Sequence, residues 1–303
     1  LSAAAGRAPS TTLRRAVRNA PRALSLLRSP GGAASFARYA AAARHLNVAL
    51  SAHSGESGEE RLTLGDYVHR GLSGFSPADL GRVAAGEAPT IFFRYFREDL
   101  LPRVVRMGPR AVAVSVNYRH QVLPAIELAG LLRRALPGVP VLAGGGMITS
   151  WKKALLGRGL RLPAFSRVGF GPGESALAMS ADGAVPGESP FLPASDEVAF
   201  DPDFGFAPLR EYLSPEPVLP VTSSRGCYWG RCGFCPEAVA PTHPYRSLEA
   251  AAFPALLREL SVRYGVARFH LTDNAVPPAT LRSLAARADL LRGLKSPASG
   301  RKK

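Results

Sequence analysis

Hydrophobic residues recur at helical spacing in the first part of the chain. Up to residue 45, Arg alternates with Ala and Leu, and the sequence SPGGA (29–33) interrupts the pattern. This pattern predicts two short helices whose basic faces are solvated. The polar sequence SGESGEE (54–60) predicts a linker. The sequence SPADLGRVAAG (76–86) predicts a helix that begins after a Ser cap and ends at Gly.

A different pattern begins at residue 110. RAVAVSVNY (110–118) is a continuous apolar run typical of a buried parallel strand. LPAIELAGLLRRALPG (123–138) has the period of an amphipathic helix ended by Pro-Gly, and VPVLAGGG (139–146) is a second apolar run. Together they predict a βαβ unit. RVGFGPGES (167–175) predicts a further strand of a parallel sheet, whose ligand-binding loops lie at its carboxyl edge.

Strands and helices also alternate in the last third of the chain. Residues 182–216, rich in Pro, Asp and Gly, predict a connector. VLPVTSSRG (218–226) predicts a strand, the segment 247–265 a helix, ARFHLTDNA (267–275) a strand, and residues 278–292 another helix. The predicted fold class is therefore α/β, with a Rossmann-like (flavodoxin-like) domain followed by a second α/β domain.

Composition and charge narrow the class of protein. With 303 residues, 46% of them hydrophobic, the chain can bury a core and has the length of two domains. Its apolar runs are far shorter than the ~20 residues of a membrane helix, so we expect a soluble protein. Its three clustered cysteines favour a reducing compartment, so we expect the cytoplasm. The net charge of +15 lies mostly at the ends, because residues 1–55 hold eight Arg and no acid and residues 282–303 hold seven Lys or Arg and one Asp. The middle is almost neutral, so neither nucleic acid nor a membrane is an expected partner.

All three cysteines lie in SRGCYWGRCGFCPE (224–237). An odd number in one cluster does not fit a secreted disulfide framework. Cys227, Cys232 and Cys235 have the spacing C-x4-C-x2-C, so one loop can turn three thiolates toward a common centre, and such clusters select zinc or iron–sulfur. Structural zinc needs a fourth ligand, for which His243 is the nearby candidate. An iron–sulfur cluster held by three cysteines would instead leave one iron open.

The loop RGCYWGRCGFC resembles the cluster loop of the radical SAM enzymes, with one residue more than the common C-x3-C-x2-C spacing. The resemblance implies that Cys227, Cys232 and Cys235 hold a [4Fe–4S] cluster whose fourth iron is chelated by S-adenosyl-L-methionine (SAM). It also implies SAM binding by Phe234, which occupies the aromatic position before the last cysteine, and by Asp273, at the end of the following strand.

In that family the reduced cluster cleaves SAM reductively, and the resulting 5′-deoxyadenosyl radical abstracts a hydrogen from the substrate. The protein's part is binding, orientation and exclusion of side reactions. The resemblance therefore implies a metal-binding radical SAM enzyme. Its expected partners are a small-molecule or peptide substrate and an electron donor such as flavodoxin or ferredoxin.

The preceding βαβ unit, with VGFGPGE after it, resembles the cobalamin (B12)-binding domain of the B12-dependent radical SAM branch. The resemblance implies that Ser115, Asn117, Gly144, Gly145 and Gly146 line the nucleotide tail of the corrin. Glycine lets the backbone approach a bulky ligand because it has no Cβ. The D-x-H-x-x-G motif that would supply a cobalt ligand is absent from these residues. Known reactions of the branch are methylation, rearrangement and modification of peptides or natural products. A Rossmann-like domain that has lost its cofactor is the alternative.

The resemblance divides the chain into a basic helical N-terminal region (1–84), a cobalamin-binding-like α/β domain (85–181), a linker (182–216) and the N-terminal part of a partial (β/α)6 radical SAM barrel (217–303). Only 68 residues follow Cys235. A strand-helix unit takes on the order of 30 residues, so we expect an incomplete barrel and no turnover by this chain alone. Two other classes stay open. One is a zinc-binding nucleic-acid module that uses the cysteines and His243, and the other is a catalytically inactive cofactor-binding or interaction protein.

Overall fold

The computed structural model of the chain describes residues 10–54, 58–182, 190–192, 200–235, 245–289 and 291. The chain forms two compact units. The first comprises Leu1–Arg14 and Asn47–Glu197, and the second comprises Arg15–Leu46 and Val198–Lys303. Within the described ranges, no helix is both long and apolar enough to cross a membrane.

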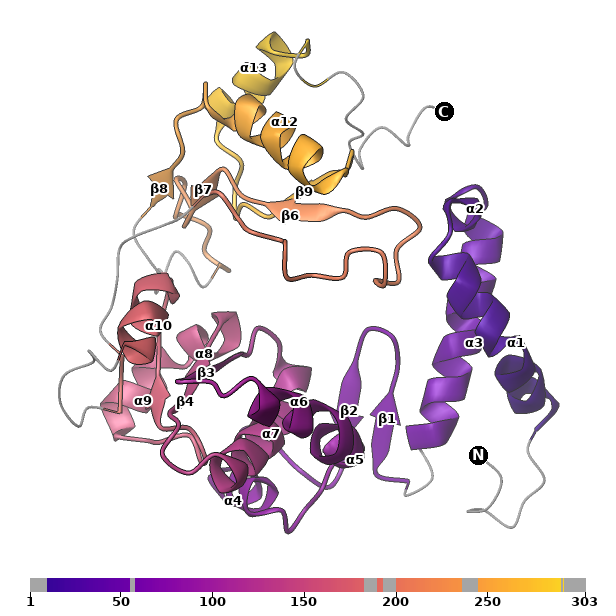
Figure 1. Ribbon diagram of the computed structural model, residues 1–303, viewed down its shortest axis with the longest axis vertical. Coiled ribbons are helices and arrows are strands. Elements are labelled where there is room, and N and C mark those ends of the chain that lie inside the picture. Colours follow the sequence, from indigo (N-terminus) through magenta and orange to yellow (C-terminus); the bar gives the residue numbers. More distant parts are fainter. Residues whose placement is uncertain are drawn as a thin grey trace. The chain divides into compact units, whose positions relative to one another are not determined.

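A parallel sheet of three strands lies at the centre of the first unit (Figure 1). Its order is β3 (Val112–Ser115), β4 (Val141–Gly144) and β5 (Arg167–Val168), and α7 (Val122–Ala135) connects the first two strands. The predicted βαβ unit is confirmed. The first unit is mixed α/β with a parallel sheet, which is compatible with a Rossmann-like fold.

The strands differ in burial and length from their predictions. β4 is buried at its first three residues, whereas β3 alternates half-buried and exposed residues. RAVAVSVNY therefore does not form a buried strand, because β3 lies at the edge of the sheet formed by the described residues. β5 has only two residues, since the chain turns after Val168 and Gly171 takes a φ of 79°.

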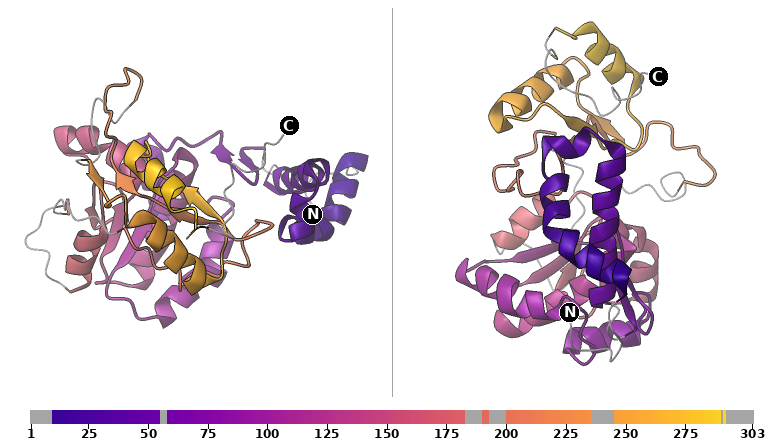
Figure 2. Two further views of the ribbon diagram at one scale, coloured as in Figure 1. Left: turned by 90° about the horizontal axis from the view of Figure 1, so that it is seen from above. Right: turned by 90° about the vertical axis from the view of Figure 1, so that its right-hand side faces the viewer.

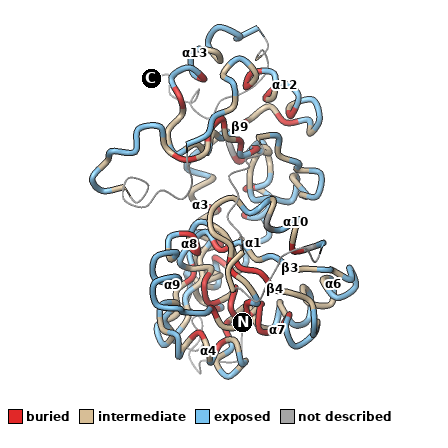
Figure 3. The backbone as a smooth tube through the Cα atoms, turned by 90° about the vertical axis from the view of Figure 1, so that its left-hand side faces the viewer, coloured by how far each residue is buried: buried red, intermediate tan, exposed pale blue. Residues whose placement is uncertain are grey.

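Helix α4 (Pro77–Ala85) has the ends that its sequence predicts. The Ser76 hydroxyl accepts a hydrogen bond from the backbone N–H of Asp79, and Gly86 ends the helix with a φ of 85°. α4 packs against α7 at Gly130, where a Cβ atom would lie only 2.2 Å from the Ala84 carbonyl oxygen. Glycine at position 130 therefore sets how closely the two helices approach. Figure 3 shows the buried residues concentrated around β4 and α7.

Several elements of the first unit were not expected from the sequence. The strands β1 (Glu60–Leu62) and β2 (Tyr67–His69) form an antiparallel hairpin. The other unexpected elements are short helices: α5 (Phe93–Tyr95), a π-helical turn (Phe96–Leu100), α6 (Leu101–Arg106), the 3-10 turn η3 (Arg119–Gln121), α8 (Gly146–Ser150) and α9 (Lys152–Arg158). Helix α10 (Glu174–Ala181) follows β5.

A buried carboxylate connects α7 to the segment before α5. Glu127 is 1% exposed, and its two oxygens accept hydrogen bonds from the Thr90 backbone N–H (2.7 Å) and hydroxyl (2.6 Å). Glu60 of β1 accepts from the Tyr67 hydroxyl (2.6 Å) and the Ile91 backbone N–H (2.8 Å). Burial raises the pKa of Glu127 above the ordinary glutamate value, and the nearby Glu60 carboxylate adds to this effect.

The second unit contains two small strand pairs and two helices that cover one of them. β6 (Leu219–Val221) runs parallel to β9 (Phe269–Leu271), and β7 (Ser224–Arg225) runs antiparallel to β8 (Arg246–Ser247). The helices are α12 (Phe253–Tyr264) and α13 (Pro278–Ala286), and Figure 1 shows α12 over the β6–β9 pair. Their shared core contains Leu219, Val221, Phe253, Leu257, Leu260, Val266 and Phe269. The predicted strand-helix-strand order is confirmed, and the described residues form no closed barrel.

The chain begins with a helical hairpin of α1 (Thr11–Leu27), the short α2 (Pro30–Ala33) and α3 (Phe36–Ser54), seen in Figure 2. The two long helices meet through a small apolar core of Ala23, Leu27, Ala42 and Leu46. These three helices contain no acidic residue. The prediction of two helices separated at SPGGA is confirmed, but the helices are not short, since they have 17 and 19 residues, and PGGA itself forms α2.

Candidate functional site

The cysteine loop begins where a buried strand leaves the core of the second unit. Leu219 and Val221 of β6 are 0% and 2% exposed, so the strand is anchored on both sides of its middle residue. The chain then pairs with β8 through β7, and Gly226 takes a φ of 73°, which is a left-handed conformation that favours glycine. Gly226 therefore permits the turn into the loop.

Asp273 holds the chain at the start of this loop. Its carboxylate accepts hydrogen bonds from the Ser223 backbone N–H (3.0 and 3.1 Å), the Ser223 hydroxyl (2.7 Å) and the Ser224 hydroxyl (2.8 Å). Both serines are almost fully buried, at 0% and 1% exposure. Thr272 donates its backbone N–H (2.8 Å) and hydroxyl (3.1 Å) to the Val221 carbonyl. The end of β9 thus positions the segment that leads into the cysteines.

The three thiols of the loop are free and partly exposed. The Gly230 N–H donates to the Cys227 sulfur (3.5 Å), and the Cys235 N–H donates to the Cys232 carbonyl (3.0 Å). No group of three or more His, Cys, Asp or Glu side chains in the described ranges is gathered closely enough to hold a metal ion. The donor set fits an iron–sulfur cluster by its chemistry and number, but the loop has to close before the three sulfurs can meet. His243, the candidate zinc ligand, lies outside the described residues.

Aromatic residues of the loop are largely on the surface. The Tyr228 ring packs edge-on against Tyr245 with 6.2 Å between centroids, and the Arg231 guanidinium lies 5.9 Å from the centre of the Trp229 ring. Phe234 is 92% exposed. An exposed phenyl ring beside the last cysteine is available to contact a ligand, because no part of the described chain covers it.

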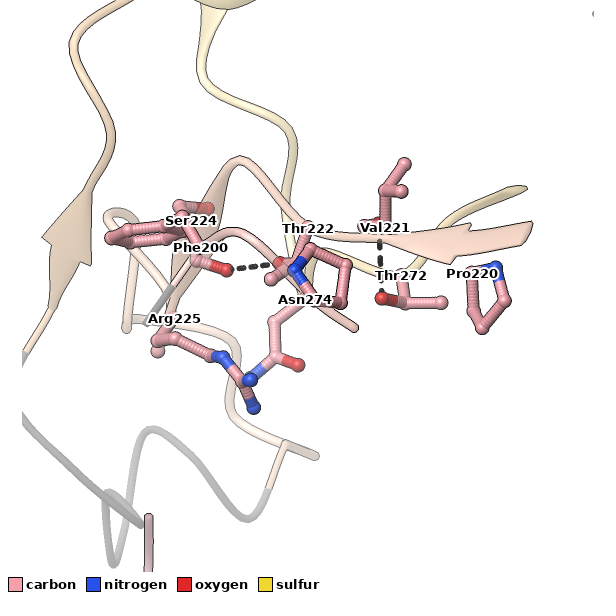
Figure 4. Close-up of a pocket in the computed structure, with 10 residues that line it drawn as sticks. Phe200, Pro220, Val221, Thr222, Ser224, Arg225, Thr272 and Asn274 are labelled. Atoms are coloured by element: carbon pink, nitrogen blue, oxygen red, sulfur yellow. Dashed lines mark hydrogen bonds between the residues drawn. The ribbon is translucent and has the colours of Figure 1, made fainter. Parts of the chain in front are cut away.

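A cavity of about 200 Å³ opens at the carboxyl ends of β6 and β9, directly before the cysteines. Figure 4 shows the Arg225 and Asn274 side chains on one side of it and Phe200 on another. Its full lining is Phe200, Pro202, Pro220, Val221, Thr222, Ser224, Arg225, Gly226, Thr272 and Asn274. Ligands of open parallel sheets bind at this edge. The volume lies below the roughly 300 Å³ at which small-molecule pockets begin, so the cavity has room for part of a nucleoside-sized ligand.

The two residues predicted to bind SAM have different surroundings. Phe234 projects into solvent, whereas the Asp273 carboxylate is occupied by Ser223 and Ser224. Asp273 borders the cavity through its neighbours Thr272 and Asn274 rather than lining it. Contact of either residue with SAM stays a prediction.

The five residues predicted to line a cobalamin tail meet at the carboxyl edge of the sheet in the first unit. Ser115 pairs with Gly144 across the β3–β4 ladder. The Asn117 side chain donates to the Ser115 hydroxyl (3.2 Å) and accepts from the Gly146 N–H (2.9 Å). Ser115, Asn117 and Gly146 are exposed. The structure therefore brings these residues together into one polar surface that faces outward.

Gly145 has a structural role in this edge. Its φ is 100°, and a Cβ atom there would lie 2.6 Å from the Val116 carbonyl oxygen. Gly144 and Gly146 differ, because a Cβ on Gly144 would lie 4.0 Å from the nearest atom, and one on Gly146 would lie 3.7 Å from Asn117. Of the three glycines, only Gly144 and Gly146 can therefore be replaced by a larger residue to test ligand binding without displacing the backbone.

Comparison of the chain with known proteins finds no matching family model, no similar curated protein and no similar solved structure. The site therefore has to be interpreted from its own residues. Sequence reasoning missed Phe200, Arg225 and the buried serines 223 and 224. The two serines lie within the quoted strand VLPVTSSRG, where an SS pair after an apolar run signals a strand end that needs a partner.

Proposed function

We propose that the second unit is the cluster-binding part of a radical SAM enzyme, with Cys227, Cys232 and Cys235 as ligands of a [4Fe–4S] cluster. The observation that carries the proposal is the position of the loop. Every thiol of the chain lies in the loop that follows the parallel strand β6 and the short strand β7, next to a cavity that a nucleoside can enter in part. A disulfide framework offers no alternative, because all three cysteines are free.

The backbone of the loop has the freedom to close around a cluster. Gly226 and Gly230 take φ values of 73° and 57°, and nothing lies within 4 Å of a Cβ built on Gly233. Asp273 holds the chain before the loop in place during such closure, since its partners Ser223 and Ser224 precede the first cysteine. The loop can thus rearrange while its base stays fixed.

A bound cluster would supply the electron for reductive cleavage of SAM to the 5′-deoxyadenosyl radical. The residues of this chain would bind and orient SAM. Arg225 and Asn274 reach the cavity with groups that donate hydrogen bonds to carboxylate or ribose oxygens. The exposed Phe234 ring offers a stacking surface for adenine.

The first experiment is anaerobic reconstitution of the chain with iron and sulfide. We expect a brown protein with about four iron and four sulfide per chain and broad absorption near 400 nm. Cys232→Ala should lose the colour and most of the iron, because two thiolates cannot hold the cluster stably. Gly233→Ala is the matched control, since it adds one methyl group to the same loop where nothing lies within 4 Å. It should keep the colour.

The outcome that contradicts the proposal is a colourless protein that holds one zinc ion per chain. A loss of zinc in Cys232→Ala would then favour the zinc module. A second measurement tests SAM itself. We expect SAM to bind the reconstituted protein and not Cys232→Ala, whereas adenosine, which lacks the chelating amino and carboxylate groups, should show no dependence on the cluster.

We also propose that the first unit binds cobalamin at the sheet edge formed by Ser115, Asn117 and Gly144 to Gly146. Support comes from the exposed polar edge and from the room at Gly144, where the nearest atom to an added Cβ would be the Gly169 carbonyl oxygen at 4.0 Å. Hydroxocobalamin should bind the chain, and Gly144→Leu should weaken binding at least about tenfold by filling that space, a loss of roughly 1.4 kcal/mol. Gly157→Leu, on α9 and with nothing within 4 Å of an added Cβ, is the control. Absence of binding by the unaltered chain would favour a Rossmann-like domain without a cofactor.

A further inference from the structure

A second cavity lies in the first unit, away from both proposed cofactor sites. Its volume is about 400 Å³, which is within the range of roughly 300 to 1,000 Å³ of small-molecule pockets. Three walls form it: the β2 strand with the turn before it, the loop of residues 70–75, and η3 with the start of α7. No function has been assigned above to any of these segments.

The floor of this cavity is apolar and is fixed by packing in the core of the first unit. Tyr67 and Leu123 are 5% and 7% exposed and belong to the core of the unit. The 70–75 loop approaches α7 closely, because a Cβ on Gly74 would lie 3.3 Å from Val122. The Phe75 ring packs on Trp151 at 5.6 Å between centroids. The floor and this wall are therefore fixed by packing before any ligand arrives.

The rim of the cavity is basic. Arg70 and Arg119 both line it, together with His69 and His120. The Arg119 guanidinium lies 5.7 Å from the centre of the Phe75 ring, which holds it at the rim. In the part of the chain that the structure describes, neither guanidinium pairs with a carboxylate. Two positive charges thus face the same space.

One acidic side chain also lines this cavity, and it is directed to a histidine. Asp66 lies 3.5 Å from Nδ1 of His120, whose ring stacks on Tyr118 with 5.5 Å between centroids. The carboxylate that lines the cavity therefore lies against the His120 ring and pairs with neither arginine in the described part of the chain. A charged head at Arg70 and Arg119 and an apolar body over Tyr67 and Leu123 would complement the cavity.

We propose that this cavity binds a small organic anion, which places an oxyanion group between Arg70 and Arg119 and an apolar body on the floor. A guanidinium binds carboxylate and phosphate oxygens with two parallel hydrogen bonds. Both headgroups share this chemistry, and the experiment distinguishes them. The inference does not depend on an iron–sulfur cluster or on cobalamin, because no residue of the cavity belongs to either site.

The test is calorimetric titration of the whole reduced chain, without reconstitution, with benzoate, benzamide and inorganic phosphate. Benzoate should bind with a Kd below about 1 mM, and its neutral analogue benzamide at least about tenfold more weakly, the ratio expected for one charge-assisted hydrogen bond. Competition by phosphate would identify a phosphate-bearing ligand, and no competition would identify a carboxylate.

Variants assign the binding to the rim. Arg119→Gln should weaken benzoate binding at least about tenfold, and Arg119→Lys, which keeps the charge, should weaken it less. Arg61→Gln removes an exposed charge from the neighbouring strand β1 and should have no effect. Thermal unfolding of each variant checks that it is folded. The proposal would be overturned if neither benzoate nor phosphate bound at concentrations up to about 10 mM, or if benzamide bound as tightly as benzoate. It would also be overturned if Arg119→Gln and Arg61→Gln weakened benzoate binding equally.

Discussion

Replacing Asp273 with Ala should destabilise the second unit and loosen the start of the cysteine loop. The change removes the acceptor of three donors: the Ser223 N–H, the Ser223 hydroxyl and the Ser224 hydroxyl. These donors belong to residues that are 0% and 1% exposed, so water cannot replace the carboxylate without a rearrangement. A buried donor left without a partner costs about 1 to 3 kcal/mol.

The sum over three donors would reach about 3 to 9 kcal/mol. Because both hydroxyl hydrogens can turn to other acceptors, we expect a loss of about 3 to 5 kcal/mol. A domain is stable by roughly 5 to 15 kcal/mol in total, so the unit would be close to unfolding. Asp273→Asn keeps the shape and one acceptor oxygen and should cost less, about 1 to 2 kcal/mol.

The assay is urea unfolding combined with hydrogen exchange of peptides that cover residues 219–225. Exchange isolates this segment even if the two units unfold separately. Asp289→Ala is the control, because Asp289 is exposed and lies 3.9 Å from Arg287, so its loss should cost under about 0.5 kcal/mol. If Asp273→Ala changes the protection of 219–225 no more than the control does, the carboxylate does not hold the loop.

Two further predictions concern the first unit. The pKa of Glu127 in the folded protein lies above its unfolded value, so its contribution to stability is fully present below about pH 4.3 and is lost as the pH rises through the folded pKa. In urea unfolding at several pH values, the free energy of unfolding of Glu127→Gln should not show this decline with rising pH. An equal pH dependence of stability in Glu127→Gln and the unaltered chain would contradict the prediction. Gly130→Ala should destabilise by about 1 to 3 kcal/mol, because the new methyl group meets the Ala84 carbonyl at 2.2 Å. Gly81→Ala, in open space on α4, should instead stabilise by up to about 1 kcal/mol, and similar thermal shifts for both variants would show that the helix contact is looser than described.

Local signals in the sequence were sufficient to predict the main helices and the order of the strands. Ser76 and Gly86 specify the ends of α4 because capping depends on residues within one turn. The apolar runs around 112 and 141 predicted the β3–β4 pair correctly. The burial of β3 could not be predicted, because an edge strand and a central strand can have the same apolar run and differ only in their neighbours.

The rest of the fold and of the candidate site depends on partners distant in sequence. The hairpin β1–β2 was missed because its strands have only three residues each, which is too short for an alternating pattern to be recognised. The spacing of the cysteines was evident in the sequence, and the loop that contains them follows β6 and β7. That the cysteines hold a metal cluster stays a prediction. That Phe200 lines the same cavity could not be inferred, since it lies in a segment without periodicity.

The distance along the chain between Asp273 and its serine partners has a consequence for synthesis of the protein. Ser223 and Asp273 are 50 residues apart. A ribosome adding about 5 to 20 residues per second needs roughly 2.5 to 10 s to make the intervening chain. During this interval the cysteines exist without the carboxylate that positions their strand. Any metal delivered to the nascent chain would therefore meet three thiols on an unanchored segment, and the order of translation delays assembly of this site until β9 has been made.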